Sequence, residues 1–183
     1  AGCRIIFMGV DSGSQKMQRA ITKNISVDGI VPLARHMVKS GISPSFSFIL
    51  GFPQETDRDR DQTLTLAFEL RAIGRTYISL YFLMPLPGTP VAKNKLQFIS
   101  NAQDWVQPAF ASSPEAARLI RRHKRIFSAW LAVKDRKGNT KLSPRILDRF
   151  SALARDHSPS FHYLFTEGGV RPTCLFPLLA RGA

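Results

Sequence analysis

Cysteine is scarce in this chain: its 183 residues contain only Cys3 and Cys174. Neither has a thiol nearby in the sequence, so no iron-sulfur or zinc motif can be built from them. The four histidines also lack the compact spacing of metal ligands. We therefore expect no metal site within this chain. Two distant cysteines are typical of a reducing compartment, which predicts a cytoplasmic protein.

Long apolar runs and acidic residues are also in short supply. No stretch of about 20 apolar residues is free of charge or proline, so the sequence predicts no transmembrane helix. Lys and Arg total 26 against 13 Asp and Glu, which gives a net charge of +13. A glycine-rich phosphate loop, a G-x-S-x-G elbow and an H-E-x-x-H motif are all missing. The sequence therefore identifies no catalytic residue.

Three apolar runs rich in Ile, Phe, Val and Tyr have the length and composition of buried strands, at residues 4–10, 45–50 and 77–83. A polar stretch rich in Gly and Pro begins at or near the end of each: Gly9-Val10-Asp11-Ser12-Gly13-Ser14, Gly51-Phe52-Pro53-Gln54-Glu55-Thr56 and Met84-Pro85-Leu86-Pro87-Gly88-Thr89-Pro90. Segments of helical period separate the runs. This order predicts a parallel sheet with right-handed crossovers, whose ligands bind at the carboxyl ends of the strands. We expect the first 90 residues to form one wall of a ligand site.

Capping signals and apolar periodicity place the helices. A short helix is expected over 15–20, and a second from Asp28, because Pro32 is tolerated only in a first turn. A third opens at Thr56 or Asp57 and ends at Gly74. Beyond an irregular stretch, the pattern predicts a basic helix from about 113, a turn at 137–139, a helix over 144–155, and an apolar tail broken by Gly and Pro.

The three polar stretches resemble those of the radical S-adenosylmethionine enzymes, most closely the branch that often carries a cobalamin-binding domain. In that branch a GIESGS-like turn, a GFPGET-like turn and a PGTP segment follow the fourth, fifth and sixth barrel strands. The counterparts here stand in the same order over about residues 2–92. The resemblance implies an α/β fold: the carboxyl-terminal half of a partial TIM-like (β/α)6 barrel in residues 1–92, followed by a basic, mainly helical region in 93–183.

The resemblance also implies which residues bind S-adenosylmethionine. Asp11 would accept hydrogen bonds from the ribose hydroxyls, although the family usually has Glu there. Gly51 would let the backbone approach the adenine. The other implied cofactor-binding residues are Ser12, Ser14, Phe52, Pro53, Glu55 and Met84. Alternatives stay open: Asp11 also suits turn capping, the serines suit turn closure, Glu55 suits loop ordering or a helix N-terminus, and Met84 suits a core position.

One family feature is missing from the sequence. Members hold a [4Fe-4S] cluster with three thiolates, usually in C-x3-C-x2-C after the first strand, and this chain has no such motif. It also begins with Ala1 and enters almost directly into an apolar run. We interpret it as a truncated product or gene fragment whose parent would carry the cluster loop upstream. The parent would cleave S-adenosylmethionine reductively with an external electron donor, and its substrate, a small molecule or a lipid, stays unidentified.

Positive charge is concentrated in residues 115–155, which hold 12 Lys and Arg against 3 Asp and Glu. Arginines at helical spacing from Arg118 to Arg125 flank an apolar stripe. Such a helix suits docking on the barrel, an anionic membrane surface or RNA. Two alternatives to a cobalamin-dependent methyl-transfer enzyme therefore stay open: a noncatalytic basic module, peripheral at the membrane or bound to RNA, and a fragment of an RNA-modifying methylthiotransferase.

Overall fold

The computed structural model describes residues 2–83, 89–90, 114–115, 118, 122, 133–134, 140–142 and 144–181. The chain divides into two compact units, which we describe separately. One comprises Ala1–Tyr81 with Arg145–Ala183, and the other comprises Phe82–Pro144. Met84 and most of the predicted basic helix lie outside the described residues. The predicted domain boundary near residue 92 stays a prediction.

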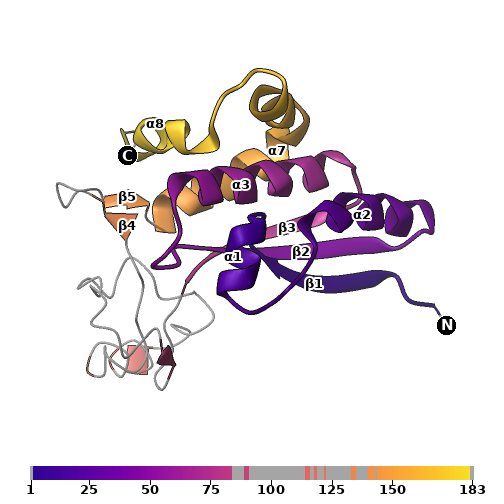
Figure 1. The fold of residues 1–183 in the computed structure, drawn as a ribbon, viewed down its shortest axis with the longest axis horizontal. Coiled ribbons are helices and arrows are strands. Elements are labelled where there is room, and N and C mark those ends of the chain that lie inside the picture. The colour runs from indigo at the N-terminus through magenta and orange to yellow at the C-terminus, as the bar shows by residue number, and fades with distance from the viewer. Residues whose placement is uncertain are drawn as a thin grey trace. The chain divides into compact units, whose positions relative to one another are not determined.

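A three-stranded parallel sheet forms the centre of the first unit (Figure 1). Its strands are β1 (Ile5–Asp11), β2 (Ser43–Leu50) and β3 (Tyr77–Phe82), in the order β1-β2-β3. Ile5 pairs with Ser43 and Gly9 with Ser47, and the register shifts between Gly9 and Asp11. The parallel α/β prediction is confirmed. The half-barrel stays a prediction, since the described strands form an open sheet.

The crossovers contain the predicted helices. They are α1 (Gln15–Ala20), a 3-10 turn (Val27–Gly29), α2 (Ile30–Lys39) and α3 (Asp57–Ala72). Thr56 caps α3, and Gly41 and Gly74 follow α2 and α3 with φ of 80° each, as the sequence predicted. The predicted start at Asp28 was early: a 3-10 turn occupies that position and α2 begins at Ile30. Pro32 is then the third helical residue. An N–H group at this position would have no acceptor within the helix, so the N–H that proline lacks is not missed.

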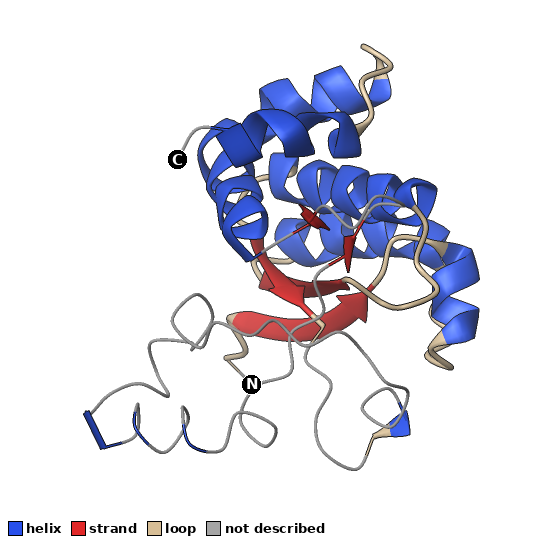
Figure 2. Cartoon of the chain, turned by 90° about the vertical axis from the view of Figure 1, so that its left-hand side faces the viewer, coloured by secondary structure: helices blue, strands red, loops and turns tan. Residues whose placement is uncertain are grey.

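One face of the sheet is covered by α2 and α3 (Figures 1 and 2). Every second strand residue points into this contact, as a two-residue period requires. The buried cluster comprises Val10, Ile30, Ala34, Phe46, Phe48, Leu66, Ala67 and Leu70. The opposite face carries the alternate residues: Ile5 and Phe7 are 61% and 64% exposed, and Tyr77 and Tyr81 are also exposed.

The C-terminal helices pack against α3 through aromatic rings. They are α7 (Pro144–Thr166), a 3-10 helix (Pro172–Leu175) and α8 (Phe176–Arg181). The ring centroid of Phe68 on α3 lies 6.3 Å from that of Phe150 and 5.2 Å from that of Phe165. The mainly helical C-terminal region is confirmed, and the predicted helix end near Arg155 agrees with the break in helical geometry at His157. The predicted tail contains a second helical segment that continues to Thr166, followed by the 3-10 helix and α8. The helix bends at His157, two residues before Pro159, and resumes, because the rings beyond the bend gain a partner in Phe68.

In the second unit, strands β4 (Val133–Lys134) and β5 (Thr140–Leu142) pair antiparallel on either side of the predicted 137–139 turn. No helix in the described part of the chain is long and apolar enough to cross a membrane.

Candidate functional site

The turn after β1 presents Asp11 at the carboxyl edge of the sheet. Asp11 has a φ of 64°, a left-handed conformation that is uncommon for residues other than glycine. Its carboxylate forms an ion pair with Lys23, and its side chain is 21% exposed. Asp11 is therefore a charged acceptor that is fixed in place and still partly open to solvent.

Ser12 and Ser14 turn away from solvent and tie this loop to α3. Ser12 Oγ lies 3.1 Å from Thr63 Oγ1, which also accepts a hydrogen bond from the amide of Gly13 at 3.0 Å. Because Thr63 donates its single proton to the carbonyl of Asp59, Ser12 must be the donor in their contact. Both serines are buried. The geometry is that of turn closure, and their contact with a cofactor stays a prediction.

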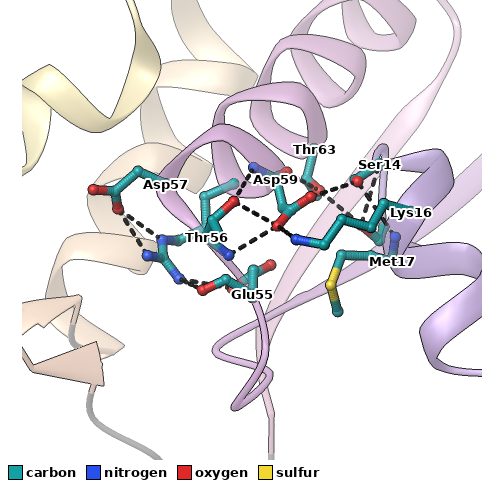
Figure 3. A network of polar contacts seen from close by, with 10 residues as sticks. Ser14, Lys16, Met17, Glu55, Thr56, Asp57, Asp59 and Thr63 are labelled. Atoms are coloured by element: carbon teal, nitrogen blue, oxygen red, sulfur yellow. Dashed lines mark hydrogen bonds and ion pairs between the residues drawn. The ribbon is translucent and has the colours of Figure 1, made fainter.

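Asp59, in the first turn of α3, is the centre of this network (Figure 3). Its carboxylate accepts hydrogen bonds from Ser14 Oγ at 2.7 Å and Lys16 Nζ at 2.8 Å. Thr56 adds its amide at 2.9 Å and its hydroxyl at 2.6 Å, so the same carboxylate completes a capping box. Burial alone would raise the pKa of Asp59, but these donors lower it well below its usual range.

Gly13 allows this loop to lie directly against α3. A Cβ atom at Gly13 would be 2.7 Å from the carbonyl oxygen of Gln62 and 2.8 Å from Thr63 Cα, and both are backbone atoms that cannot move aside. The glycine of the SGS motif is therefore required by packing.

Gly13→Ala should lower the free energy of unfolding by about 1–3 kcal/mol, because the added methyl group forces the loop away from α3. Urea unfolding of the 183-residue chain measures the change. Gly29→Ala is the matched control: a Cβ there meets no atom within 4 Å, so its stability should change little. Equal unfolding midpoints for the two variants would contradict the packing argument.

The loop after β2 is organised by a buried carboxylate. Glu55 Oε2 accepts a hydrogen bond from the amide of Gly51 at 2.8 Å. The same oxygen forms an ion pair with Arg60 Nη1 at 3.2 Å. Asp57 holds the other side of the guanidinium at 2.7 Å. Burial raises the pKa of Glu55 to about 7, despite the opposing effects of Gly51 and Arg60. Gly51 has a φ of 94°, a conformation that favours glycine.

The remaining predicted residues contribute less. Phe52 is half-buried and Pro53 is exposed, both in the turn after β2. Met84 lies outside the described residues. A cavity of about 610 Å³ lies elsewhere in the same unit, with Val27, Arg58, Asp61, Phe165 and Arg171 among its lining residues. None of the predicted cofactor-binding residues lines it.

The described residues include no group of three or more His, Cys, Asp or Glu that could hold a metal ion. Cys3 and Cys174 are free and exposed. Thiolates are the ligands that an iron-sulfur cluster requires, so these residues do not fit such a cluster.

Sequence reasoning placed Ser12, Ser14 and Glu55 in the two loops, with turn closure and loop ordering among their open roles. It did not identify the partners of these side chains, which are Thr63, Asp59 and Arg60. The capping box, Thr56 with Asp59 three residues on, was a visible local signal. The contacts of Thr63 with the β1 loop span 50 and 51 residues, and no local pattern predicts them.

The fold and these loops define an α/β protein with an acidic group at the carboxyl edge of a parallel sheet. No family model matches the chain. Ninety residues, 48% of the chain, are 36% identical to the tRNA-2-methylthio-N(6)-dimethylallyladenosine synthase of Psychrobacter arcticus, covering 18% of it. The same-named protein of Ehrlichia ruminantium is 34% identical over 90 residues and 20% of its length. An uncharacterized methyltransferase of Pyrococcus horikoshii is 30% identical over 88 residues, again 48% of the chain and 18% of the relative. The chain spans about a fifth of the length of these curated relatives.

Proposed function

We propose that this chain supplies part of the S-adenosylmethionine-binding wall of a radical S-adenosylmethionine enzyme. The observation that carries the proposal is Asp11, a partly exposed carboxylate in a left-handed turn at the carboxyl edge of a parallel sheet. Ligands of such sheets bind at this edge, and acidic residues bind the ribose of other adenosine ligands there. The order of the three motifs and the similarity to a tRNA-2-methylthio-N(6)-dimethylallyladenosine synthase and to a methyltransferase support the proposal.

In this proposal the residues divide into two roles. Asp11 accepts hydrogen bonds from the ribose hydroxyls, and Lys23 orients its carboxylate through the ion pair. Gly51 presents backbone to the adenine, with Phe52 beside it. Ser12, Ser14 and Glu55 hold the two loops through Thr63, Asp59 and Arg60.

S-adenosylmethionine, when cleaved reductively in such enzymes, supplies a radical that abstracts hydrogen from an unreactive position. The described residues do not fit the [4Fe-4S] cluster, so no step of that chemistry is assigned to them. Their part is to bind and orient the nucleoside. The cluster would belong to the rest of the enzyme, and the electron donor would be external to it.

Two reactions stay open for the whole enzyme: methylthiolation of RNA and methyl transfer with cobalamin as a further cofactor. The names of the relatives include both a tRNA-2-methylthio-N(6)-dimethylallyladenosine synthase and a methyltransferase, so they do not separate these reactions. A basic module that binds RNA or an anionic membrane is the alternative from another class, based on the charge of residues 115–155.

Calorimetric titration of the 183-residue chain with S-adenosylhomocysteine tests the proposal, because this stable analogue keeps the adenosine and the amino-acid group. Asp11→Ala should weaken binding about ten- to hundredfold, since hydrogen bonds to a charged group are lost. Asp148→Ala, which removes an exposed carboxylate on α7, should bind as the parent chain does.

Absence of binding by the unmodified chain, or equal affinity in Asp11→Ala, would contradict the proposal. Titrations with RNA and with anionic vesicles across a salt series then test the basic-module alternative. That alternative requires binding at low salt that is lost as the salt concentration rises.

A further inference from the structure

The Asp11 turn is held in a conformation that its own residues disfavour. Among the described residues other than glycine, four have positive φ. Three of these belong to the Asp11–Lys23 ion pair or flank Lys23 in the sequence: Asp11, Thr22 and Asn24. Such conformations persist when neighbouring groups impose them, and they concentrate at functional sites. A specific group should therefore hold this turn in place.

Gln18, on α1 directly behind the turn, is that group. Its side chain is fully buried, and its Nε2 donates one hydrogen bond to the carbonyl of Val10 at 2.7 Å and another to the carbonyl of Ser12 at 2.6 Å. These two carbonyls flank Asp11. The first carbonyl belongs to the Val10–Asp11 peptide and the second to the Ser12–Gly13 peptide, so a single amide bridges the turn that contains Asp11. The Val10 carbonyl also accepts the amide of Ser12 at 2.8 Å, which closes the turn through its own main chain.

The main chain of Gln18 also places the partner of Asp11. Its carbonyl oxygen accepts hydrogen bonds from the amides of Lys23 at 3.0 Å and Asn24 at 3.4 Å. These bonds close the left-handed turn over Thr22 to Asn24, from which the Lys23 side chain reaches Asp11. Gln18 thus forms hydrogen bonds to the residues on either side of Asp11 and to the main chain of Lys23.

The amide group is what this position requires. The NH2 group of a glutamine side chain has two protons, one for each of the two carbonyl oxygens. The carboxylate of a glutamate at this position would instead place an oxygen next to both carbonyl oxygens. Gln18 Oε1 is buried and has no hydrogen-bond partner among the described residues. Turning the amide over would leave the two carbonyls facing an oxygen, so the orientation is determined by its surroundings.

We propose that Gln18 is the positioning residue for nucleoside binding: it sets the left-handed turn of Asp11 and the place of Lys23, and so orients the carboxylate toward the ribose hydroxyls. This inference rests on the proposed function. Gln18 does not touch the nucleoside, and its effect is exerted through Asp11.

Gln18→Met tests it, because methionine keeps the length and shape of glutamine without the amide. Calorimetry with S-adenosylhomocysteine should show about a tenfold weaker affinity than the unmodified chain. Gln15→Met is the matched control on the same helix: it removes hydrogen bonds to the main chain of Ile25 and Val27 and should leave the affinity unchanged. Urea unfolding confirms that each variant is folded. If Gln18→Met does not unfold cooperatively, Gln18→Asn, which draws the amide back by one methylene, takes its place.

The double variant Asp11→Ala/Gln18→Met separates positioning from general damage. If Gln18 acts through Asp11, the double variant binds no more weakly than Asp11→Ala alone. A further tenfold loss in the double variant, or unchanged affinity in folded Gln18→Met, would overturn the inference while the proposed function stands.

If the unmodified chain does not bind the analogue, the proposed function fails, and the role of Gln18 in the turn is decided without ligand. A left-handed residue brings its amide and α protons close together, so NMR should show a strong intraresidue cross-relaxation peak for Asp11. This peak should weaken in Gln18→Met and persist in Gln15→Met. Its persistence in Gln18→Met would overturn the inference.

Discussion

Asp59→Ala should lower the free energy of unfolding by about 2–4 kcal/mol, because loss of a helix cap costs about 1 kcal/mol and a buried donor left without its acceptor costs about 1–3 kcal/mol. The carboxylate accepts from the buried hydroxyl of Ser14, from Thr56 and from the exposed ammonium of Lys16, so its loss leaves the Ser14 hydroxyl without this acceptor and removes the capping box of α3. Urea unfolding of the 183-residue chain, followed by circular dichroism, measures the change.

Asp57→Ala is the control for this prediction. Asp57 lies in the same first turn of α3, so it interacts with the same helix dipole, but its side chain is 36% exposed. Its loss removes one of the two carboxylate partners of the buried Arg60 guanidinium, so it should cost about 1–2 kcal/mol, less than the loss of Asp59. If the two variants lose equal stability, helix-dipole charge rather than the buried network explains the role of Asp59.

Acid should weaken the same network. The pKa of Asp59 is held below its ordinary value of 3.8, so the folded chain takes up this proton less readily than the unfolded chain. The stability that Asp59 contributes is therefore present above pH 3.8 and is lost as the pH falls below it.

The second large effect is a pH dependence of opposite sign at Glu55. Its pKa is about 7 in the folded chain against an ordinary 4.5, so the folded chain binds the proton more tightly than the unfolded chain does. The stabilising effect of that proton is fully present below pH 4.5 and is lost as the pH rises through 7. A difference of this size corresponds to about 3 kcal/mol.

Glu55→Gln should remove this pH dependence, because the amide keeps an acceptor for the Gly51 N–H but does not titrate. Unfolding free energies at several pH values between 4.5 and 8 should fall for the unmodified chain and stay nearly level for the variant. Glu167→Gln, at an exposed position, should follow the unmodified chain. Parallel curves for Glu55→Gln and the unmodified chain would show that Glu55 keeps an ordinary pKa in the fold.

Local signals in the sequence predicted the elements that depend on near neighbours. The start of α3 follows from Thr56, and the ends of α2 and α3 follow from Gly41 and Gly74. The strands follow from apolar runs of the right length and composition. The mainly helical character of the C-terminal region was predicted, but the helical segments beyond the break at His157 were not placed, because Phe161 and Phe165 pack on Phe68 nearly a hundred residues away.

Residue patterns were enough to predict the parallel α/β arrangement and the loops at its carboxyl edge, because strand length, helical period and turn residues are local properties. The contacts that hold those loops became visible only in the folded chain. Thr63 and Asp59 lie about 50 residues from the serines they hold, and Gln18 acts on a turn whose carbonyls it meets only after folding. Burial makes these contacts strong, since water no longer competes for the same donors and acceptors.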